Sequence, residues 1–269
     1  MHQAERVFIQ TVKNYYKKYG RHDLPWRKTA DPYKIVVSEI MLQQTQVERV
    51  IPKYRAFLKL FPTAHVLAQA PLGAVLHAWS GLGYNRRAKY LQQMAQSIVT
   101  EHKGKFPTTI EGFQKLPGIG PYTAGAIYAF AYNKPVPMIE TNIRTVYIHH
   151  FFPTKKFVSD KDLMKVIEQT LDTKNPREWY WALMDYGSYL KSTGVKNNAK
   201  SKHYTKQSKF EGSKRQIRGA IMREVLKGPT TVQHILKILD QTKKEVQPVF
   251  DDLAQEGFIK KEKGKYLIL

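Results

Sequence analysis

The stretch Leu116–Ala126, which reads LPGIGPYTAGA, constrains the fold of this chain more than any other. Its first two glycines permit a positive φ or a close backbone approach. Pro121 stands where a helix can begin, because its missing N–H costs nothing there. Segments 109–115 and 123–130 on either side have helical patterns. The sequence therefore predicts two helices joined by a tight Gly-Ile-Gly hairpin.

The start of the second helix is a candidate anion site. Its first backbone N–H groups have no intrahelical acceptor, and the helix dipole favours negative charge there. The chain carries 44 Lys and Arg against 22 Asp and Glu, a net charge of +22. Such an excess favours a polyanionic partner, nucleic acid before membrane. The predicted anion is a nucleic-acid phosphate, and the alternative is a helix–turn–helix corner without a ligand.

The sequence contains no cysteine, which excludes disulfides, thiol catalysis and a Cys-ligated zinc ion or iron–sulfur cluster. Its first residues lack the basic and apolar regions of a signal peptide. No run approaches the roughly 18 apolar residues that span a bilayer. We therefore expect a cytoplasmic, DNA-associated protein without a membrane partner.

Helical periodicity continues to about residue 192 without a sustained strand pattern. Residues 193–214 are rich in Lys, Ser, Asn and Gly and are expected to form a basic linker. Residues 215–269 show three more helical periods and then a hairpin with a Lys-Gly turn. The prediction is an all-α fold with a helical core over 1–192 and a winged-helix-like module. Such modules bind DNA or other proteins, and a structural cap is the alternative.

Periodicity also predicts the individual helices of the core. Expected helices lie over residues 3–19, 33–54, 64–79, 87–102 and 143–151, with two more within 160–192. Pro52 is expected to interrupt the second of these, because proline breaks a helix interior.

Glu39 is a carboxylate within an apolar helical stretch. A buried, unpaired carboxylate tends to take up a proton, and a protonated acid near neutral pH suits general-acid catalysis. The alternative is a position on the solvent face of the helix, the usual one for Glu. Gln43, one turn on, and Gln44 have the donors and acceptors of base recognition, or else lie on a solvated face.

Two further segments contain candidate residues. An apolar segment precedes Glu140 and Asn142, which lie at the start of a predicted helix. Because Glu is a poor helix cap, Glu140 is either tolerated beside a Thr141 cap or kept for chemistry. The turn 79–87 could place a stacking ring and phosphate-binding arginines together, or it is an ordinary turn before a solvated basic helix.

Four stretches in the same order resemble the helix-hairpin-helix (HhH-GPD) DNA glycosylases. They are Leu24–Arg27, Ser38–Val47, Gly81–Tyr84 and Leu116–Gly120. The run MLQQTQ in the second stretch is most similar to adenine DNA glycosylases of the MutY type. The resemblance implies a two-lobed helical core and a monofunctional base-excision-repair enzyme. This enzyme would hydrolyse the N-glycosidic bond of a flipped-out adenine opposite 8-oxoguanine or guanine in double-stranded DNA. We expect it to be a monomer.

The resemblance also implies roles for single residues. Glu39 matches the acid that protonates the leaving adenine, and Tyr122 stands where bifunctional relatives carry a β-eliminating lysine. Gln44 and Tyr84 match residues that wedge into the duplex. The other candidate catalytic and base-binding residues are Glu140, Asn142, Arg27, Leu42, Gln43 and Asp185. Further DNA contacts are expected from the basic turn and from the hairpin segment. They are Arg86, Arg87, Gly118, Ile119, Gly120 and Thr123. A hairpin sodium or potassium site is implied at the carbonyls of Gln114, Leu116 and Ile119.

Glu39 and Glu140 form the candidate catalytic pair. N-glycosidic cleavage needs an acid for the leaving base and an anion beside the oxocarbenium-like sugar. A wedge and an apolar pocket offset the cost of moving the base out of the helix.

The chain departs from the family pattern in three places. The family's sugar-stabilising carboxylate is an aspartate, and Glu140 is one methylene longer. The four cluster-binding cysteines are absent, so we expect no iron–sulfur cluster and no required cofactor. The domain that reads 8-oxoguanine is not recognisable. The alternatives are therefore a glycosylase for uracil or thymine opposite guanine, a glycosylase for hypoxanthine, and a protein that binds lesions without catalysis.

Overall fold

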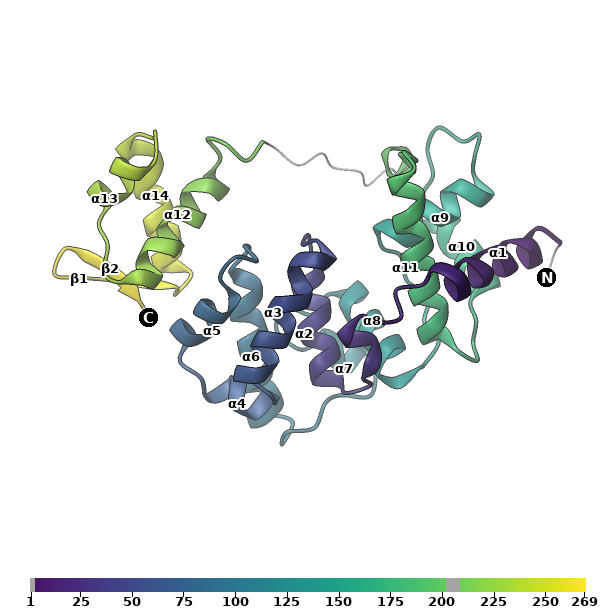
Figure 1. Cartoon of the computed structure of the whole chain (residues 1–269). Helices are drawn as coiled ribbons and strands as arrows, with labels where there is room; N and C mark the ends of the chain where they lie inside the picture. Colours follow the sequence, from purple (N-terminus) through teal and green to yellow (C-terminus); the bar gives the residue numbers. More distant parts are fainter. Residues whose placement is uncertain (1–2, 202–208) are drawn as a thin grey trace. The chain divides into compact units, whose positions relative to one another are not determined.

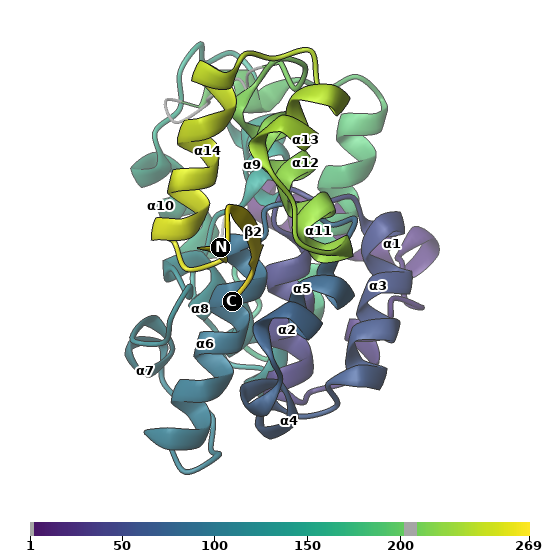
Figure 2. The ribbon, with the colours of Figure 1, turned by 90° about the vertical axis from the view of Figure 1, so that its left-hand side faces the viewer.

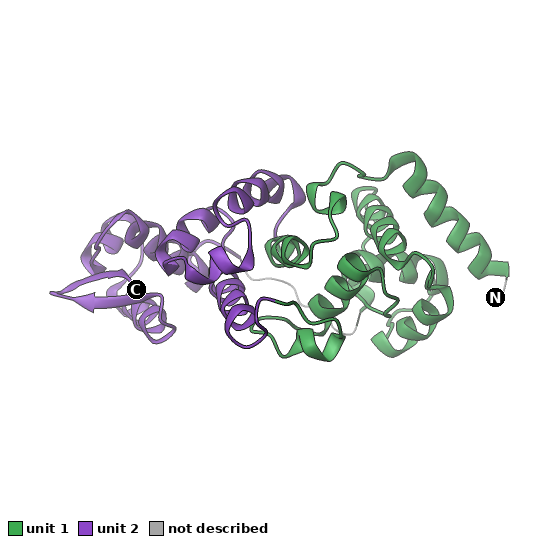
Figure 3. Cartoon of the chain, turned by 90° about the horizontal axis from the view of Figure 1, so that it is seen from below, with its two compact units in different colours: residues 1–44, 105–205 green, residues 45–104, 206–269 purple. Residues whose placement is uncertain are grey.

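The computed structural model describes residues 3–201 and 209–269. The chain forms two compact units, unit 1 (Met1–Gln44, Lys105–Thr205) and unit 2 (Thr45–Gly104, Lys206–Leu269), which Figure 3 distinguishes by colour. Apart from one two-stranded sheet, the regular structure of the described ranges is helical (Figure 1), which confirms the all-α prediction. Part of the predicted linker 193–214, namely 202–208, lies outside the described residues. Within the described ranges, every helix is too short or too polar to cross a bilayer.

Unit 1 is built from two separate parts of the chain. The first part contributes α1 (Gln3–Tyr19), the 3-10 helix η1 (Pro25–Lys28) and α2 (Pro32–Leu42). The second contributes α7 (Ile110–Gln114), α8 (Pro121–Tyr132), α9 (Thr141–Phe151), α10 (Asp160–Thr170), α11 (Pro176–Ser192) and η2 (Asn197–Lys200). Helix α2 packs against α8, and α11 packs against both α1 and α9. These contacts join the beginning of the chain to its middle.

The sequence of α2 explains why this helix lies in the core. Asp31 caps it by accepting a hydrogen bond from the N–H of Tyr33 at 2.9 Å, and Pro32 occupies the first helical position. Most of the residues that follow are apolar, as in a helix that is largely covered by protein. Almost the whole length of α2, including Glu39, is buried.

Gly187 lies in α11, where this helix meets the start of α9. A Cβ atom built on Gly187 would overlap the carbonyl oxygen of Asn142 and lie 2.7 Å from the Asn142 Cβ. The two helices can therefore approach this closely only because position 187 has no side chain. The close approach sets the position of the first turn of α9, where Asn142 and the preceding Glu140 lie.

Asp185, two residues earlier on α11, ties η1 to this helix. Its carboxylate accepts from Arg27 Nη1 at 2.7 Å and Nη2 at 2.9 Å, and from Arg21 Nε at 2.7 Å. The Arg27 and Asp185 side chains are 4% and 2% exposed. Burial alone would raise the pKa of Asp185, but the hydrogen bonds and charge of Arg27 outweigh burial and lower it. The ion pair joins positions 158 residues apart in the sequence.

Unit 2 also combines two parts of the chain. Its first part contains α3 (Val47–Leu60), α4 (Ala64–Gln69), α5 (Leu72–Trp79) and α6 (Arg86–Thr100). Its second part contains α12 (Lys214–Lys227), α13 (Val232–Ile238), α14 (Lys243–Gln255), β1 (Ile259–Glu262) and β2 (Lys265–Ile268). We call residues 209–269 the C-terminal module. Helix α4 packs against α6, and α12 of the module contacts α5.

Two predicted helices are each divided in the structure. The helix expected over 33–54 is α2 and α3, and the break lies at Gln44, whose φ of 54° is left-handed, rather than at Pro52 inside α3. The helix expected over 64–79 is α4 and α5. Ala70 there is extended, which a following proline favours, and Pro71 caps α5. Both corrections concern where helices stop.

The three helices and the hairpin predicted at the end of the chain are present (Figure 2). Strands β1 and β2 are antiparallel, and Lys263 and Gly264 between them have φ values of 47° and 78°. Two successive positive φ values match a type I′ hairpin turn. Thr230 adds a bridge beside β2, because its N–H and carbonyl pair with Tyr266 at 2.9 and 2.7 Å. The order of elements is that of a winged helix, and its binding role stays a prediction.

Replacing Gly187 by Ala should destabilise the protein by about 1–3 kcal/mol, a typical overpacking cost. Gly219 in α12 is a matched control, because a Cβ there would meet only Arg223 Nη1, at 3.8 Å. Gly219→Ala should stabilise the helix by about 0.5–1 kcal/mol. Urea denaturation measures both changes. A Gly187→Ala protein as stable as the wild type would contradict the close helix packing.

Replacing Asp185 by Asn should cost about 3–5 kcal/mol at pH 7, because Arg27 keeps a buried charge without its anion. The lowered pKa of Asp185 means that its stabilisation is present above its unfolded pKa of about 3.9 and is lost as pH falls below it. The difference between variant and wild type should therefore shrink in acid. Asp23→Asn, which removes a surface ion pair with Lys28, is the control and should have little effect. Urea denaturation at several pH values tests both expectations.

Candidate active site

Glu39 has a carboxyl group that is almost completely enclosed by protein. The residue is 8% exposed, and the hydroxyl of Tyr122 donates to its Oε2 across a long 3.5 Å contact. Burial, and then the negative charge of Glu140, raise the pKa of Glu39 to about 8. Glu39 therefore holds a proton at neutral pH. The alternative position on a solvent-facing surface is wrong.

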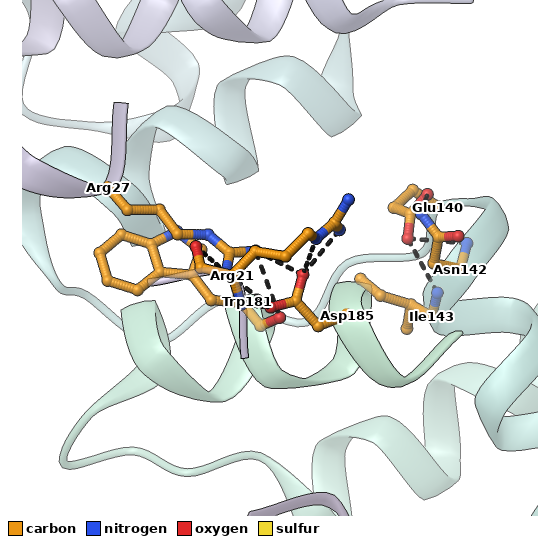
Figure 4. Close-up of polar contacts among 7 residues, drawn as sticks. All are labelled: Arg21, Arg27, Glu140, Asn142, Ile143, Trp181 and Asp185. Atoms are coloured by element: carbon orange, nitrogen blue, oxygen red, sulfur yellow. Dashed lines mark hydrogen bonds and ion pairs between the residues drawn. The ribbon is translucent and has the colours of Figure 1, made fainter. Parts of the chain in front are cut away.

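Glu140 is the N-cap of α9. Its Oε1 accepts hydrogen bonds from the backbone N–H groups of Asn142 at 2.7 Å and Ile143 at 2.8 Å, and its Oε2 accepts from Asn142 Nδ2 at 3.2 Å (Figure 4). Burial raises the pKa of Glu140, while these hydrogen bonds lower it by favouring the charged form. The positive end of the helix dipole acts in the same direction as the hydrogen bonds.

The start of α9 corrects two expectations. The helix begins at Thr141, two residues before the predicted start, and Thr141 is its first residue rather than its cap. The backbone of Glu140 is extended, with φ −134° and ψ 178°, and its side chain folds back onto the first helical turn. Glu140 is thus a helix cap whose carboxylate is hydrogen-bonded by the first turn of α9, although burial leaves its pKa raised.

The two carboxyl groups of unit 1 differ in their hydrogen-bond partners. Glu140 accepts three hydrogen bonds, two of them from backbone N–H groups, whereas the contact at Glu39 is a single long one to a neutral phenol. Such unequal surroundings assign one group of a pair to the acid and the other to the anion. The geometry gives Glu39 the proton and Glu140 the charge.

Tyr122 lies in the first turn of α8 and is half-buried. Burial, and then the charges of Glu39 and Glu140, raise the pKa of its hydroxyl well above the ordinary value. The side chain is therefore a neutral hydrogen-bond donor. It has no amine, so it cannot form a Schiff base with a sugar aldehyde.

Asn142 contains an unusual polar atom. Its Oδ1 is buried and has no hydrogen-bond donor among the described residues. Buried acceptors in folded proteins are nearly always paired, with protein groups or with water. This oxygen, next to the Glu140 carboxylate, is suited to accept a hydrogen bond from a water molecule or a ligand hydroxyl.

The predicted hairpin joins α7 to α8. Gly118 has a φ of 75° and therefore suits glycine, whereas Gly120 has a φ of −86° and open space around its Cβ position, so for Gly120 only the close backbone approach to a ligand stays a prediction. The N–H of Ile119 donates to the carbonyl of Leu116 at 3.2 Å. No side chain of the described residues caps α8. The cation site at the hairpin carbonyls, including that of Gln114 at the end of α7, stays a prediction.

Residues at the end of α2 lie beside the start of α8. Gln43 Nε2 donates to the hydroxyl of Thr123 at 3.4 Å, which brings two predicted site residues together. Leu42 is half-buried, and Gln44 is exposed. The predicted contact of Leu42 with a base and that of Gln44 with the duplex are compatible with these positions and stay predictions.

Arg27 and Asp185 are brought together as a pair, as Figure 4 shows. The guanidinium of Arg27 also lies 5.5 Å from the ring of Trp181. The two charges neutralise each other in the interior, which gives both residues a structural role. Their predicted contact with a base stays a prediction.

The remaining predicted DNA contacts lie in unit 2, in the loop that precedes α6. Tyr84 is 41% exposed and has a φ of 48°, and it follows two glycines, Gly81 and Gly83, that also have positive φ. Arg87 is only 8% exposed and donates to the carbonyls of Leu82 and Gly83 and the hydroxyl of Thr45, each at 3.1 Å. These hydrogen bonds give Arg87 a structural role within the loop, and its predicted contact with a phosphate stays a prediction.

Arg86 is exposed, and its guanidinium pairs with Glu256 of the C-terminal module. Neither Glu256 nor Gly187 was predicted as a functional position. A glycine inside a helical period was the available signal for Gly187, whereas the partner of Arg86 lies 170 residues away and leaves no local pattern.

Comparison with known proteins places these residues in a family. The model of the HhH-GPD superfamily base excision DNA repair proteins matches residues 37–172, a range that includes Glu39, Tyr122, Glu140 and Asn142. The adenine DNA glycosylase of Buchnera aphidicola subsp. Baizongia pistaciae is 40% identical over 186 residues. That alignment covers 68% of this chain and 53% of the relative, so this chain spans about half the length of that protein. The adenine DNA glycosylase of Mycolicibacterium smegmatis is 34% identical over 235 residues, 79% of this chain and 78% of the relative.

Solved structures show the same fold. A thermostable thymine-DNA glycosylase has a TM-score of 0.64 at 24% identity and covers 75% of this chain and 97% of its own. Endonuclease III in a non-covalent DNA complex has a TM-score of 0.55 at 16% identity and covers 71% of this chain and 86% of its own. The family match, the relatives and the shared fold agree: this chain belongs to the HhH-GPD superfamily of base excision DNA repair proteins.

Proposed function

We propose that this protein is a monofunctional DNA glycosylase that releases adenine paired with 8-oxoguanine or guanine. The observation that carries the proposal is the pair of carboxyl groups in unit 1, in which Glu39 is protonated and Glu140 is hydrogen-bonded as an anion. The choice of adenine is supported by the relatives that are adenine DNA glycosylases.

Glu39 is the general acid. It gives its proton to a ring nitrogen of the flipped-out adenine, which then leaves with the electron pair of the N-glycosidic bond. The cost of burying this carboxyl keeps it protonated at a pH where an ordinary glutamic acid would be ionised. The Tyr122 hydroxyl lies beside the acid and limits its orientation.

Glu140 stabilises the positive charge that develops on the deoxyribose as the bond breaks. Its three hydrogen bonds hold the carboxylate in place before the substrate arrives. Asn142 Oδ1 accepts a hydrogen bond from the attacking water. Water then forms a bond to the sugar carbon in place of the base and gives its proton to the Glu39 carboxylate, so the acid is regenerated and the product is an abasic site.

Tyr122 occupies the position at which, by the resemblance, bifunctional relatives carry a β-eliminating lysine. Because the phenol has no amine, the enzyme cleaves the glycosidic bond and leaves the strand intact. Double-stranded DNA with a mismatched or damaged base is the partner, and the protein acts on it as a cytoplasmic monomer. The net charge of +22 and the uncapped start of α8 support contact with DNA phosphates.

A panel of duplexes, each with one mismatched or modified base, tests the activity. We expect abasic sites at adenine opposite 8-oxoguanine or guanine, and strands that break only after alkali treatment. Glu39→Gln should lower the single-turnover rate about 10²–10⁴-fold, the usual contribution of a general acid. Glu111→Gln, an exposed residue of α7, is the control and should keep the wild-type rate.

Each other outcome of the panel has a defined meaning. Release of only uracil, thymine or hypoxanthine would refute the choice of adenine. Selective binding of lesions without release of any base would refute the enzyme. A Glu39→Gln protein with the wild-type rate would remove Glu39 from the mechanism.

The pH dependence of the single-turnover rate should show the protonation of Glu39. The acid works in its protonated form, so the rate should fall about tenfold per unit once pH rises above about 8. Glu140 must be ionised, and burial raises its pKa, so the rate should also fall in acid. The residual activity of Glu39→Gln should lack the decline at high pH. A wild-type rate that increases through pH 8 would contradict this assignment.

A further inference from the structure

The C-terminal module contacts α6 and the Tyr84 loop within unit 2. We call the loop Gly81–Asn85 the Tyr84 loop. Glu256, which follows α14, has a carboxylate that binds two arginines. Arg86 at the start of α6 donates from Nε to Oε2 at 2.8 Å and pairs with Oε1 through Nη2. Arg218 on α12 donates to the same two oxygens at 2.9 and 2.5 Å. One carboxylate thus joins the module to the first residue of α6.

A second contact lies one turn further along α6. The ammonium of Lys89 donates to the carbonyl of Glu256 and, at 3.1 Å, to that of Gly257. It also lies 5.2 Å from the centre of the Phe258 ring, and the Arg218 guanidinium lies 5.1 Å from the centre of that ring. Gly257 has a φ of 67°, which lets the chain turn here.

The third contact reaches Tyr84 itself. Arg215 on α12 donates from Nη1 to the Tyr84 hydroxyl at 3.2 Å. Inside the loop, the guanidinium of Arg87 lies 5.4 Å from the centre of the Tyr84 ring. The ring is therefore held by one arginine of the core and one of the module, although its backbone has the left-handed conformation that costs a tyrosine free energy.

The charges explain why Glu256 matters most. Arg86, Lys89 and Arg218 are all cations that meet at this contact, and without an anion they would repel one another. The Glu256 side chain is only 20% exposed, so water screens these charges incompletely. Removal of its charge should loosen the module from α6 and should free the Tyr84 loop.

We propose that the C-terminal module is a brace for the Tyr84 loop: Glu256 docks the module on α6, and Arg215 positions the Tyr84 ring for entry into the DNA duplex. The DNA step rests on the proposed function, in which Tyr84 wedges beside the target base pair. The docking of the module on α6 does not depend on the proposed function. Glu256 and Arg215 are positioning residues, because they act through Tyr84.

Hydrogen exchange of the full-length protein tests the docking without any need for catalysis. Glu256→Gln should speed amide exchange in peptides that cover residues 80–90 by at least about tenfold, since hydrogen bonds between charged groups are the strong ones. The matched control is Glu224→Gln. Glu224 also binds two cations, Lys227 at 2.7 Å and His234 at 3.1 Å, but both lie within the module.

The outcomes of the exchange experiment are clear. Faster exchange at 80–90 in Glu256→Gln alone supports the brace. Equal exchange in the two variants would overturn it and leave the module as a structural cap. Exchange that increases equally throughout the module would show that Glu256→Gln unfolds it. In that case Lys89→Met, which leaves every module side chain in place, should still speed exchange at 80–90, and no change there would overturn the brace.

The DNA step is read with 2-aminopurine placed next to the target base, because its fluorescence rises when it is unstacked. Arg215→Met should reduce this rise by several-fold, and Arg215→Lys should restore part of it by returning a donor. The single-turnover rate of Arg215→Met should fall on duplex but not on single-stranded substrate, where no wedge is needed. An unchanged fluorescence rise would overturn the positioning role. A wild type that unstacks DNA but releases no base would refute the proposed function and leave the brace intact.

Discussion

Three of the carboxyl groups that unit 1 withdraws from water are compensated in different ways, and these differences determine what the unit can do. Asp185 is neutralised by two arginines, and it joins the start of the chain to α11. Glu140 is held by the N–H groups at the start of α9. Glu39 has only a long contact with a phenol. The first group therefore stabilises the fold, the second remains charged, and the third keeps a proton.

Much of this could be predicted from the sequence, and the exceptions have physical causes. Apolar periodicity identified the helices, and the neighbours of Glu39 indicated its burial. The break at Gln44 was missed because a left-handed glutamine has no sequence signal. The part that Arg87 plays inside the loop was not predicted, because a basic residue beside an aromatic one fits both a phosphate contact and a loop anchor. Long-range partners such as Arg86 and Glu256 have no local pattern at all.

In the proposed function, unit 1 carries the chemistry and unit 2 gives access to the target base. The candidate acid, the anion and the phenol all belong to unit 1, whereas the exposed ring at the tip of a strained loop belongs to unit 2. In unit 2 the C-terminal module contacts the start of α6 and this loop through charged groups. Charged contacts of this kind respond to salt, so ionic strength acts on the protein itself as well as on its hold on DNA.

The ion pair between Arg27 and Asp185 also has a consequence for synthesis of the chain. Its partners are 158 residues apart, and α2 packs against α8, which is likewise translated after the first part of unit 2. At about 5–20 residues per second, Arg27 leaves the ribosome roughly 10–30 seconds before Asp185. Until α8 (Pro121–Tyr132) has also left the ribosome, the apolar surface of α2 lacks the native neighbour that the second part of unit 1 provides. The nascent chain cannot complete the packing of α2 until the middle of the sequence has been synthesised. In the meantime the apolar residues around Glu39 are the ones that need protection from aggregation.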